Sequence, residues 1–216
     1  MAKLVICDLD GTLVDSRHDL AEAGNAARAA IGLAPVPLET VAGYVGDGAE
    51  KLIERLTPDC APAQRSEAMR AFKNRYREVC CVRTRPYEGI TDALAGLTSS
   101  GWILGVATNK PLEFTQLILD ACGLARWFAH VRGGDRWKKP DPGQLLDILQ
   151  AAQCDPASSW MVGDHHTDII AARAAGVSAA WCAWGIGRRD DLAVDAIVDA
   201  PASLPSSLAR AMPSRA

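Results

Sequence analysis

Four aspartates follow short apolar runs of the chain and could act together as one charged site. Asp8 and Asp10 follow a run near the N-terminus, and Asp164 and Asp168 follow another run far along the sequence. Like charges about 4 Å apart repel by about 4 kcal/mol at an effective dielectric constant of about 20, so four gathered carboxylates require a cation. Oxygen ligands favour a hard ion. The sequence therefore predicts a Mg²⁺ site at these four aspartates.

Three further polar residues could complete a site for phosphoryl transfer. Thr108 and Asn109 follow an apolar run, and Lys139 precedes a helical pattern. A lysine, a hydroxyl group and Mg²⁺ suit a phosphoryl group, because its transfer spreads negative charge over three oxygens. We expect these residues to bind that group.

The spacing of the first two aspartates indicates how they would divide the work. Asp8 and Asp10 are two residues apart, and Gly11 lets the chain turn sharply after them. One carboxylate can then face the substrate while the other lies beside the leaving group. This arrangement permits nucleophilic attack by one and proton transfer by the other.

Most of the chain alternates short apolar runs with helical patterns. We expect strands at about 4–7, 102–107, 159–162, 177–182 and 196–198, and helices at about 88–100, 111–123, 142–153 and 166–176. Runs that are apolar on both faces suit buried parallel strands. The alternation predicts an α/β fold with a Rossmann-like parallel sheet, whose ligands bind at the carboxyl ends of the strands. The candidate residues named above lie near those ends.

Residues 16–83 interrupt this alternation. They contain no convincing strand and indicate helices at about 18–31, 37–46, 49–56 and 62–80. All six tryptophans lie outside this stretch. We therefore expect a helical cap domain at 16–83, inserted into a catalytic core domain formed by 1–15 and 84–216. A short helix and a frayed end are expected from 203 to 216.

Composition excludes several classes of protein. The chain has 216 residues, of which 49% are hydrophobic and 23% charged, so it is globular rather than disordered. A net charge of −3 gives no basic surface for nucleic acid, and no apolar run is long enough to cross a membrane. An acid as early as Asp8 argues against a secretory signal. Seven scattered cysteines without a CxxC pair favour a reduced, cytoplasmic protein without zinc.

Four motifs, taken in order, resemble those of the haloacid dehalogenase superfamily of hydrolases. They are Asp8–Ser16, Thr108-Asn109, Lys139–Pro142 and Gly163–Gly176. The resemblance covers nearly the whole chain, and the helical stretch lies where that family has its cap. Within the superfamily the chain is most similar to the phosphoglycolate phosphatase group, which is supported by the stretches 43–52 and 183–187.

The resemblance implies catalytic roles for the motif residues. Asp8 would be the nucleophile that becomes an aspartyl phosphate, and Asp10 would be the general acid and base. Gly11, Thr108, Asn109 and Lys139 would bind the phosphoryl group, with Thr108 and Lys139 also aiding catalysis.

The resemblance also implies the ligands of the metal. These would be Asp8, Asp164 and the backbone carbonyl of Asp10, with Asp168 either a ligand or a neighbour of one. His165 replaces a small residue that is common in the family. Because His165 and His166 are adjacent, they would point in different directions on a helix and make a poor metal pair.

Two cap residues are candidates for selecting the substrate. Lys51 and Arg55 lie four residues apart on one face of a predicted helix, near a glycine-rich loop. They could grip an anionic leaving group. Alternatively, the two side chains belong to an ordinary solvated helix surface without a role in binding.

The sequence thus predicts a Mg²⁺-dependent phosphomonoesterase that acts on a small phosphorylated metabolite, with 2-phosphoglycolate as the leading substrate. A phosphomutase or a pyrophosphatase of the same fold is an alternative. A phospho-accepting receiver module is another, although receivers are about half this length and have no inserted cap. The substrate and the oligomeric state stay open.

Overall fold

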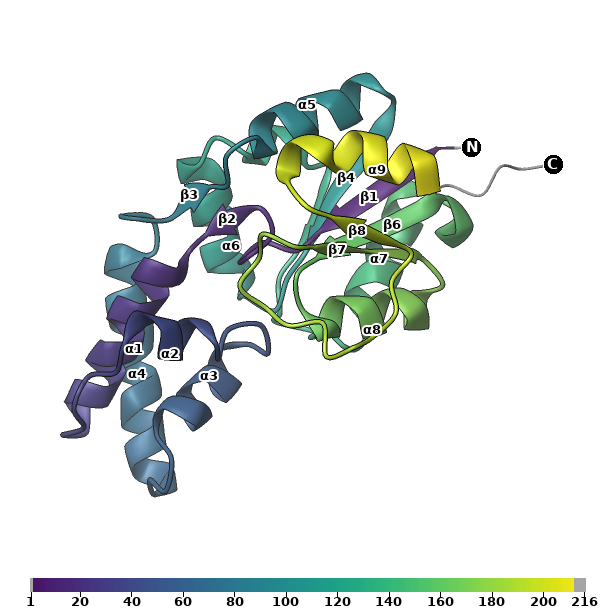
Figure 1. Ribbon diagram of the computed structural model, residues 1–216. Coiled ribbons are helices and arrows are strands. Elements are labelled where there is room, and N and C mark those ends of the chain that lie inside the picture. The colour runs from purple at the N-terminus through teal and green to yellow at the C-terminus, as the bar shows by residue number, and fades with distance from the viewer. Residues whose placement is uncertain (1, 212–216) are drawn as a thin grey trace.

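The computed structural model describes residues 2–211 and contains a six-stranded sheet (Figure 1). In spatial order the strands are β5 (His130–Arg132), β4 (Trp102–Ala107), β1 (Lys3–Cys7), β6 (Ser159–Gly163), β7 (Ser178–Cys182) and β8 (Ala196–Val198). Every neighbouring pair is parallel. The predicted α/β fold with a Rossmann-like parallel sheet is confirmed.

Helices cover both faces of the sheet, because alternate strand residues point to opposite sides. Val5 and Cys7 pack toward one face, and Leu4 and Ile6 toward the other. The first face is covered by α5 (Ile90–Ser99), α6 (Leu112–Ala121) and α9 (Leu204–Ala211). The second face is covered by α7 (Gly143–Ala152) and α8 (His166–Ala175). Figure 1 shows α5 and α9 on one side of the strands and α8 on the other.

The edge strand β5 is the sheet strand that the sequence analysis missed. All three of its residues are half-buried, and two of them, His130 and Arg132, are polar. A search for short apolar runs cannot find such a strand, because two of its three residues are polar. Its position is fixed by pairing with β4 alone.

In the sequence, four helices separate β1 from the other strands of the six-stranded sheet. They are α1 (Arg17–Ala30), α2 (Leu38–Ala42), α3 (Ala49–Leu56) and α4 (Pro62–Val79). We call residues 16–83 the helical insert. It has an apolar cluster of its own, which includes Leu20, Ile53 and Phe72, and it lies to one side of the sheet in Figure 1. These helices fall within the span predicted for a cap; its boundaries as a domain stay a prediction.

The helix expected at 37–46 ends earlier than predicted. Helix α2 stops at Ala42, and residues 43–48, which we call the insert loop, form turns. Gly46 and Gly48 have φ values of 125° and 90°, which a right-handed helix does not permit. The glycines that limit α2 thus shape a loop that lies against the sheet edge.

A two-stranded antiparallel ladder joins the helical insert to the rest of the chain. β2 (Val14–Asp15) precedes the insert and β3 (Arg85–Pro86) follows it, and the two pair directly. The fully buried Asp19 carboxylate accepts hydrogen bonds from the amides of Arg83 and Thr84, at 2.8–3.0 Å. The two segments that connect the helical insert to the core are therefore joined to each other.

The helical insert also contacts the core away from that ladder. Lys138 Nζ lies 2.5 Å from Glu50 Oε2, and Arg77 Nε lies 3.2 Å from Glu113 Oε1. The Tyr76 ring meets the Phe114 ring edge-on, with the centroids 5.0 Å apart. These contacts hold the insert against the sheet edge.

Short 3₁₀ helices occupy Ala125–Trp127, Pro156–Ser158 and Pro201–Ser203. Helix α9 is the predicted terminal helix, and the frayed end expected after it lies outside the described residues. All seven cysteines are free thiols. Among the described helices, none is both long enough and apolar enough to span a membrane.

Candidate active site

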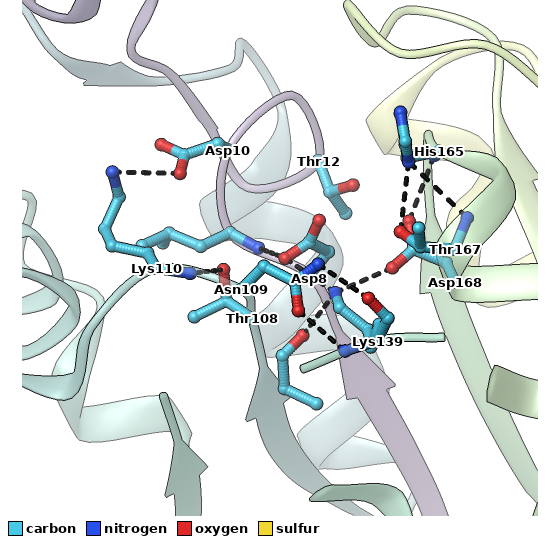
Figure 2. A network of polar contacts seen from close by, with 12 residues as sticks. Asp8, Asp10, Thr12, Thr108, Asn109, Lys110, Lys139, His165, Thr167 and Asp168 are labelled. Carbon is cyan, nitrogen blue, oxygen red and sulfur yellow. Dashed lines mark hydrogen bonds and ion pairs between the residues drawn. The ribbon is translucent and has the colours of Figure 1, made fainter. Parts of the chain in front are cut away.

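The carboxyl ends of β1, β4 and β6 bring the predicted site residues together (Figure 2). Asp8 directly follows β1, Thr108 directly follows β4, and Asp164 directly follows β6. Because these three strands are neighbours and parallel, their ends meet at one edge of the sheet. The topology thus gathers residues that are far apart in the sequence.

Asp8 is buried and has one carboxylate oxygen free. Its Oδ1 accepts a hydrogen bond from the Leu9 amide at 2.7 Å and lies 2.9 Å from Lys139 Nζ. Within the described residues, Oδ2 accepts no hydrogen bond. Burial raises the pKa of Asp8 to about 6, against the opposing effect of Lys139. The free oxygen is suitable for nucleophilic attack.

The Lys139 ammonium offsets negative charge of the aspartates at the carboxyl edge of the sheet. Its buried Nζ lies 2.9 Å from Asp8 Oδ1 and 2.7 Å from Asp168 Oδ1, and it donates a hydrogen bond to the Ala107 carbonyl at 2.6 Å. Burial alone would lower the pKa of the ammonium, but the two carboxylates outweigh burial and raise it. Lys139 therefore stays charged. Its neighbour Lys138 instead reaches Glu50 of the helical insert.

Asp164 is held by groups from both ends of the chain. Thr12 Oγ1 donates to Oδ1 at 2.9 Å, and the amides of Ile186 and Gly187 donate to Oδ2 at 2.9 and 2.8 Å. The Thr12 side chain thus reaches from the loop after β1 to Asp164 after β6. Burial, with repulsion from Asp8 and Asp168, raises the pKa of Asp164 to about 7.

Three of the four predicted metal ligands form one cluster that could hold a metal ion. Asp8, Asp164 and Asp168 each offer a carboxylate oxygen, and these oxygens lie within 4.8 Å of one another. All three residues are buried, and Lys139 supplies a single positive charge against them. Burial, with repulsion among the carboxylates, raises the pKa values of Asp8 and Asp164. A divalent cation would relieve it.

The side chain of Asp10 lies outside this cluster. Its Oδ1 accepts a hydrogen bond from Ser16 Oγ at 2.5 Å, and its Oδ2 lies 3.0 Å from Lys110 Nζ. Figure 2 shows the carboxylate of Asp10 turned toward Lys110. Its side chain is therefore not placed as a metal ligand, and the role of its backbone carbonyl stays a prediction.

Lys110 is a buried charge that the sequence analysis missed. Its Nζ pairs with Asp10 and donates a hydrogen bond to the Tyr76 hydroxyl of the helical insert at 2.8 Å. Although burial opposes the charge, Asp10 raises the pKa of Lys110, so the ammonium persists. Its place directly after Thr108-Asn109 and before a helix was the available signal.

Thr108 and Asn109 differ in whether their side-chain hydrogen-bond donors are available to a ligand. The Thr108 hydroxyl oxygen accepts the Lys110 amide at 3.3 Å, so its proton is available to a ligand. The Asn109 side chain instead donates to the carbonyls of Gly46 and Lys139, each at 2.9 Å, and accepts the Lys139 amide at 2.7 Å. Asn109 also lines a cavity, and its contact with a phosphoryl group stays a prediction. This amide joins the insert loop to the Lys139 segment.

Gly11 supplies space for the Asp164 carboxylate. Its amide donates to the Val14 carbonyl at 3.0 Å, and its φ is 82°. A Cβ at this position would lie 2.1 Å from Asp164 Oδ2. The residue must be glycine so that Asp164 can approach, and its contact with phosphate stays a prediction.

A small cavity of about 60 Å³ lies between these residues and the helical insert. Its core wall includes Asp8, Asp10 and Thr108. The insert contributes mainly apolar side chains, together with the exposed Lys73. The residues from the insert are Leu20, Val45, Gly46, Gly48, Ala49, Leu52, Phe72, Lys73 and Tyr76.

Lys51 and Arg55 are not among the residues that line this cavity, and their predicted contact with an anionic leaving group stays a prediction. Ala49 and Leu52 are the residues of α3 that face it. The Lys51 ammonium pairs with Glu54 at 2.8 Å. The Arg55 guanidinium donates to the carboxylate of Asp47 at 2.5 Å.

The two adjacent histidines lie closer together than predicted. The rings of His165 and His166 have centroids 4.1 Å apart. His165 lies before the first residue of α8, with extended backbone at φ −122° and ψ 151°, so helical geometry does not separate the two side chains. The expectation that they point apart is wrong.

Comparisons with known proteins agree with this geometry. The family model of haloacid dehalogenase-like hydrolases matches residues 5–182. The phosphoglycolate phosphatase of Vibrio cholerae is 36% identical over 200 residues, which is 88% of each chain. That of Nitrosospira multiformis is 40% identical over 181 residues, covering 81% of this chain and 80% of its own.

Solved structures show the same likeness in three dimensions. The crystal structure of a predicted phosphoglycolate phosphatase from Haemophilus somnus has a TM-score of 0.88 at 30% identity, and the match covers 95% of this chain and 97% of that one. The sheet order, the four motifs at its edge and the match over most of the sequence lead to one conclusion. This chain belongs to the haloacid dehalogenase-like hydrolase family.

Proposed function

We propose that this protein is a Mg²⁺-dependent phosphomonoesterase that works through an aspartyl phosphate on Asp8. The observation that carries the proposal is the free Oδ2 of Asp8, a residue that lines the cavity, while Lys139 and the Leu9 amide hold Oδ1. Such an oxygen can attack without first breaking a hydrogen bond. Lys139 and the Thr108 hydroxyl would stabilise the charge on the phosphoryl oxygens.

In the first step, Asp8 Oδ2 forms a bond to phosphorus and the bond between phosphorus and the ester oxygen breaks. Protonated Asp10 gives its proton to that oxygen, which leaves as an alcohol. For this transfer Asp10 must turn from Lys110, which it contacts in the present structure at 3.0 Å.

In the second step, water attacks the phosphorus of the aspartyl phosphate. Asp10 takes a proton from this water, and the bond between phosphorus and Asp8 breaks to release inorganic phosphate. One carboxylate thus acts as acid and then as base, and the enzyme returns to its starting state.

Asp8, Asp164 and Asp168 would hold the Mg²⁺ ion. Their oxygens suit a hard cation, and the charge imbalance of the cluster supports the assignment. When bound, Mg²⁺ supplies positive charge that offsets the negative charge of the phosphoryl group.

The leading substrate is 2-phosphoglycolate, a small phosphate ester that carries a carboxylate. The names of the relatives support this choice, and so does the small size of the cavity. Lys73 lines the cavity on the insert side. We therefore assign the recognition of the substrate carboxylate to Lys73 instead of Lys51 and Arg55.

The test is a panel of phosphate compounds compared by kcat/KM with Mg²⁺, including phosphoglycolate, sugar phosphates, nucleotides and pyrophosphate. We expect release of inorganic phosphate, with phosphoglycolate hydrolysed best. Transfer of phosphate between two sugars without release would make the protein a mutase and overturn the proposal. Preference for pyrophosphate would overturn the substrate class.

A further inference from the structure

A second group of metal-binding side chains lies where the insert loop meets the start of α8. Asp47, His165 and His166 each offer one ligand atom, and these atoms lie within 4.8 Å of one another. His166 Nε2 is 3.9 Å from Asp47 Oδ1. The Cδ2–Nε2 side of the His165 ring faces the insert loop, since a Cβ on Gly46 would lie 2.6 Å from that Nε2.

The other polar atom of each side chain lies near a further polar group. His165 Nδ1 lies 3.0 Å from Thr167 Oγ1, and His166 Nδ1 lies 3.1 Å from Asp190 Oδ2. Arg55 donates to the second oxygen of Asp47. In this structure the Thr167 amide donates to His165 Nδ1 at 3.5 Å, so an ion bound at Nε2 would require the proton to move to Nδ1, which would then donate to Thr167 Oγ1. Metal-bound histidines generally present their other ring nitrogen to such a partner.

His166 Nε2 faces Asp47 Oδ1 across 3.9 Å, and the Nε2 side of the His165 ring faces the same loop at Gly46. Within the described residues, no hydrogen bond joins these three side chains. Ligand atoms around a tetrahedral ion lie about 3.3 Å apart, so side-chain shifts of about 1 Å would close the set. Two imidazoles with one carboxylate suit zinc and similar ions rather than Mg²⁺.

We propose that Asp47, His165 and His166 form a site for a divalent transition-metal ion such as Zn²⁺. The sequence alone predicts no zinc site, because the chain has no cluster of cysteines and histidines close together in sequence. In the proposed site the third ligand, Asp47, comes from the insert loop, which is far from the two histidines in sequence. His166 and Asp47 are only partly buried, so an ion can reach the site from solvent.

Metal binding at this site would join the insert loop to the core. Asp47 belongs to the insert loop, and both histidines belong to the core. The Gly46 carbonyl is already bonded to Asn109, so the loop lies in the required place. A bound ion would therefore oppose separation of the helical insert from the sheet edge, and with it the exchange of ligands in the cavity.

The test is calorimetric titration of the full chain with Zn²⁺ in excess Mg²⁺, which keeps the carboxylate cluster filled. We expect one Zn²⁺ per chain, and a Kd at least about tenfold higher in Asp47→Asn and in His166→Gln. His130→Gln is the matched control, because His130 lies on β5, and should bind as the wild type does. Circular dichroism of each variant checks the fold.

Two outcomes would overturn the proposal. Equal Kd values in all four proteins would assign the ion to other groups, such as the thiols. Binding that weakens in Asp164→Asn but not in Asp47→Asn would assign it to the carboxylate cluster. The joining of insert and core has its own readout: Zn²⁺ should slow amide exchange of residues 43–48, and unchanged exchange there would contradict it.

Discussion

The core wall and the insert wall of the cavity differ in how firmly their side chains are held. On the core wall, Asp8 and Lys110 are buried and each contacts at least two polar partners. On the insert wall, Leu52 and Phe72 make apolar contacts, and Lys73 is exposed. One wall is a connected polar network, and the other is a mainly apolar surface with one unburied charge.

This difference indicates a division of labour. A group in a connected network cannot be changed without disturbing its partners, whereas an exposed lysine on an apolar surface can. We therefore expect substitutions on the core wall to affect the chemical step and stability, and substitutions on the insert wall to affect the choice of substrate. The predictions below test this contrast, beginning with the largest effect.

Asp8→Asn should abolish turnover, lowering kcat by about four orders of magnitude or more, because the amide cannot act as the nucleophile. Steady-state phosphate release measures the effect, and circular dichroism with a Mg²⁺ titration checks the fold and the metal site. Asp120→Asn on the exposed part of α6 is the control. Appreciable turnover by Asp8→Asn would assign the nucleophile elsewhere.

Lys139→Met should lower both stability and activity. It leaves the buried carboxylates of Asp8 and Asp168 without their ammonium, which costs about 3–5 kcal/mol, and kcat/KM should fall by about 100-fold or more. Urea unfolding and steady-state kinetics measure the two effects. Lys138→Met removes only a surface ion pair and should change stability by less than about 1 kcal/mol. Similar losses in both variants would contradict the assignment of Lys139.

Lys73→Ala should change specificity rather than chemistry. We expect KM for carboxylated phosphate esters to rise about tenfold, which is about 1.4 kcal/mol, with little change for esters without a carboxylate. Lys51→Ala is the matched control on the same insert, because Lys51 does not line the cavity. An equal rise for both kinds of ester would remove the selecting role of Lys73.

Mg²⁺ binding should release protons at acid pH. The pKa values of Asp8 and Asp164 are about 6 and about 7, above the ordinary value, so the metal-free fold holds protons that the unfolded chain does not. Its stability therefore falls as pH rises from about 4 to about 7. Mg²⁺ should release about one proton at pH 6 and almost none at pH 8.5.

Calorimetry in two buffers with different heats of ionisation measures this release. Asp164→Asn, which loses one of the two raised groups, should release fewer protons at pH 6. A release that does not depend on pH would mean that these carboxylates are not the ones that bind the ion.

The parts of the fold that could be predicted are those decided by apolar patterns. The run Trp102–Ala107 is almost wholly buried, and its predicted bounds match β4. The missed strand β5 has no such run, because an edge strand of half-buried residues resembles a loop. Sequence patterns reveal elements whose residues form an apolar run, including the edge strand β8.

The site shows the same limit. Asp8, Lys139 and Asp164 could be found from their positions after strands and in motifs, but their partners could not. Asn109 and Lys110 are adjacent, yet one joins two loops and the other pairs with Asp10. Their roles depend on which distant atoms come within hydrogen-bond reach, and local sequence does not record that.

The ladder between β2 and β3 has a consequence for how such proteins can diversify. Val14 pairs with Pro86 and Asp15 with Arg85, so the two ends of a long excursion are held side by side. The helical insert therefore connects β2 to β3 in the way that a turn connects the two strands of a β-hairpin. Whatever is grafted onto this stem, whether longer, shorter or differently folded, leaves the spacing of the strands untouched. The β2–β3 ladder therefore allows the segment that contacts the substrate to change in evolution while the residues at the sheet edge stay in place.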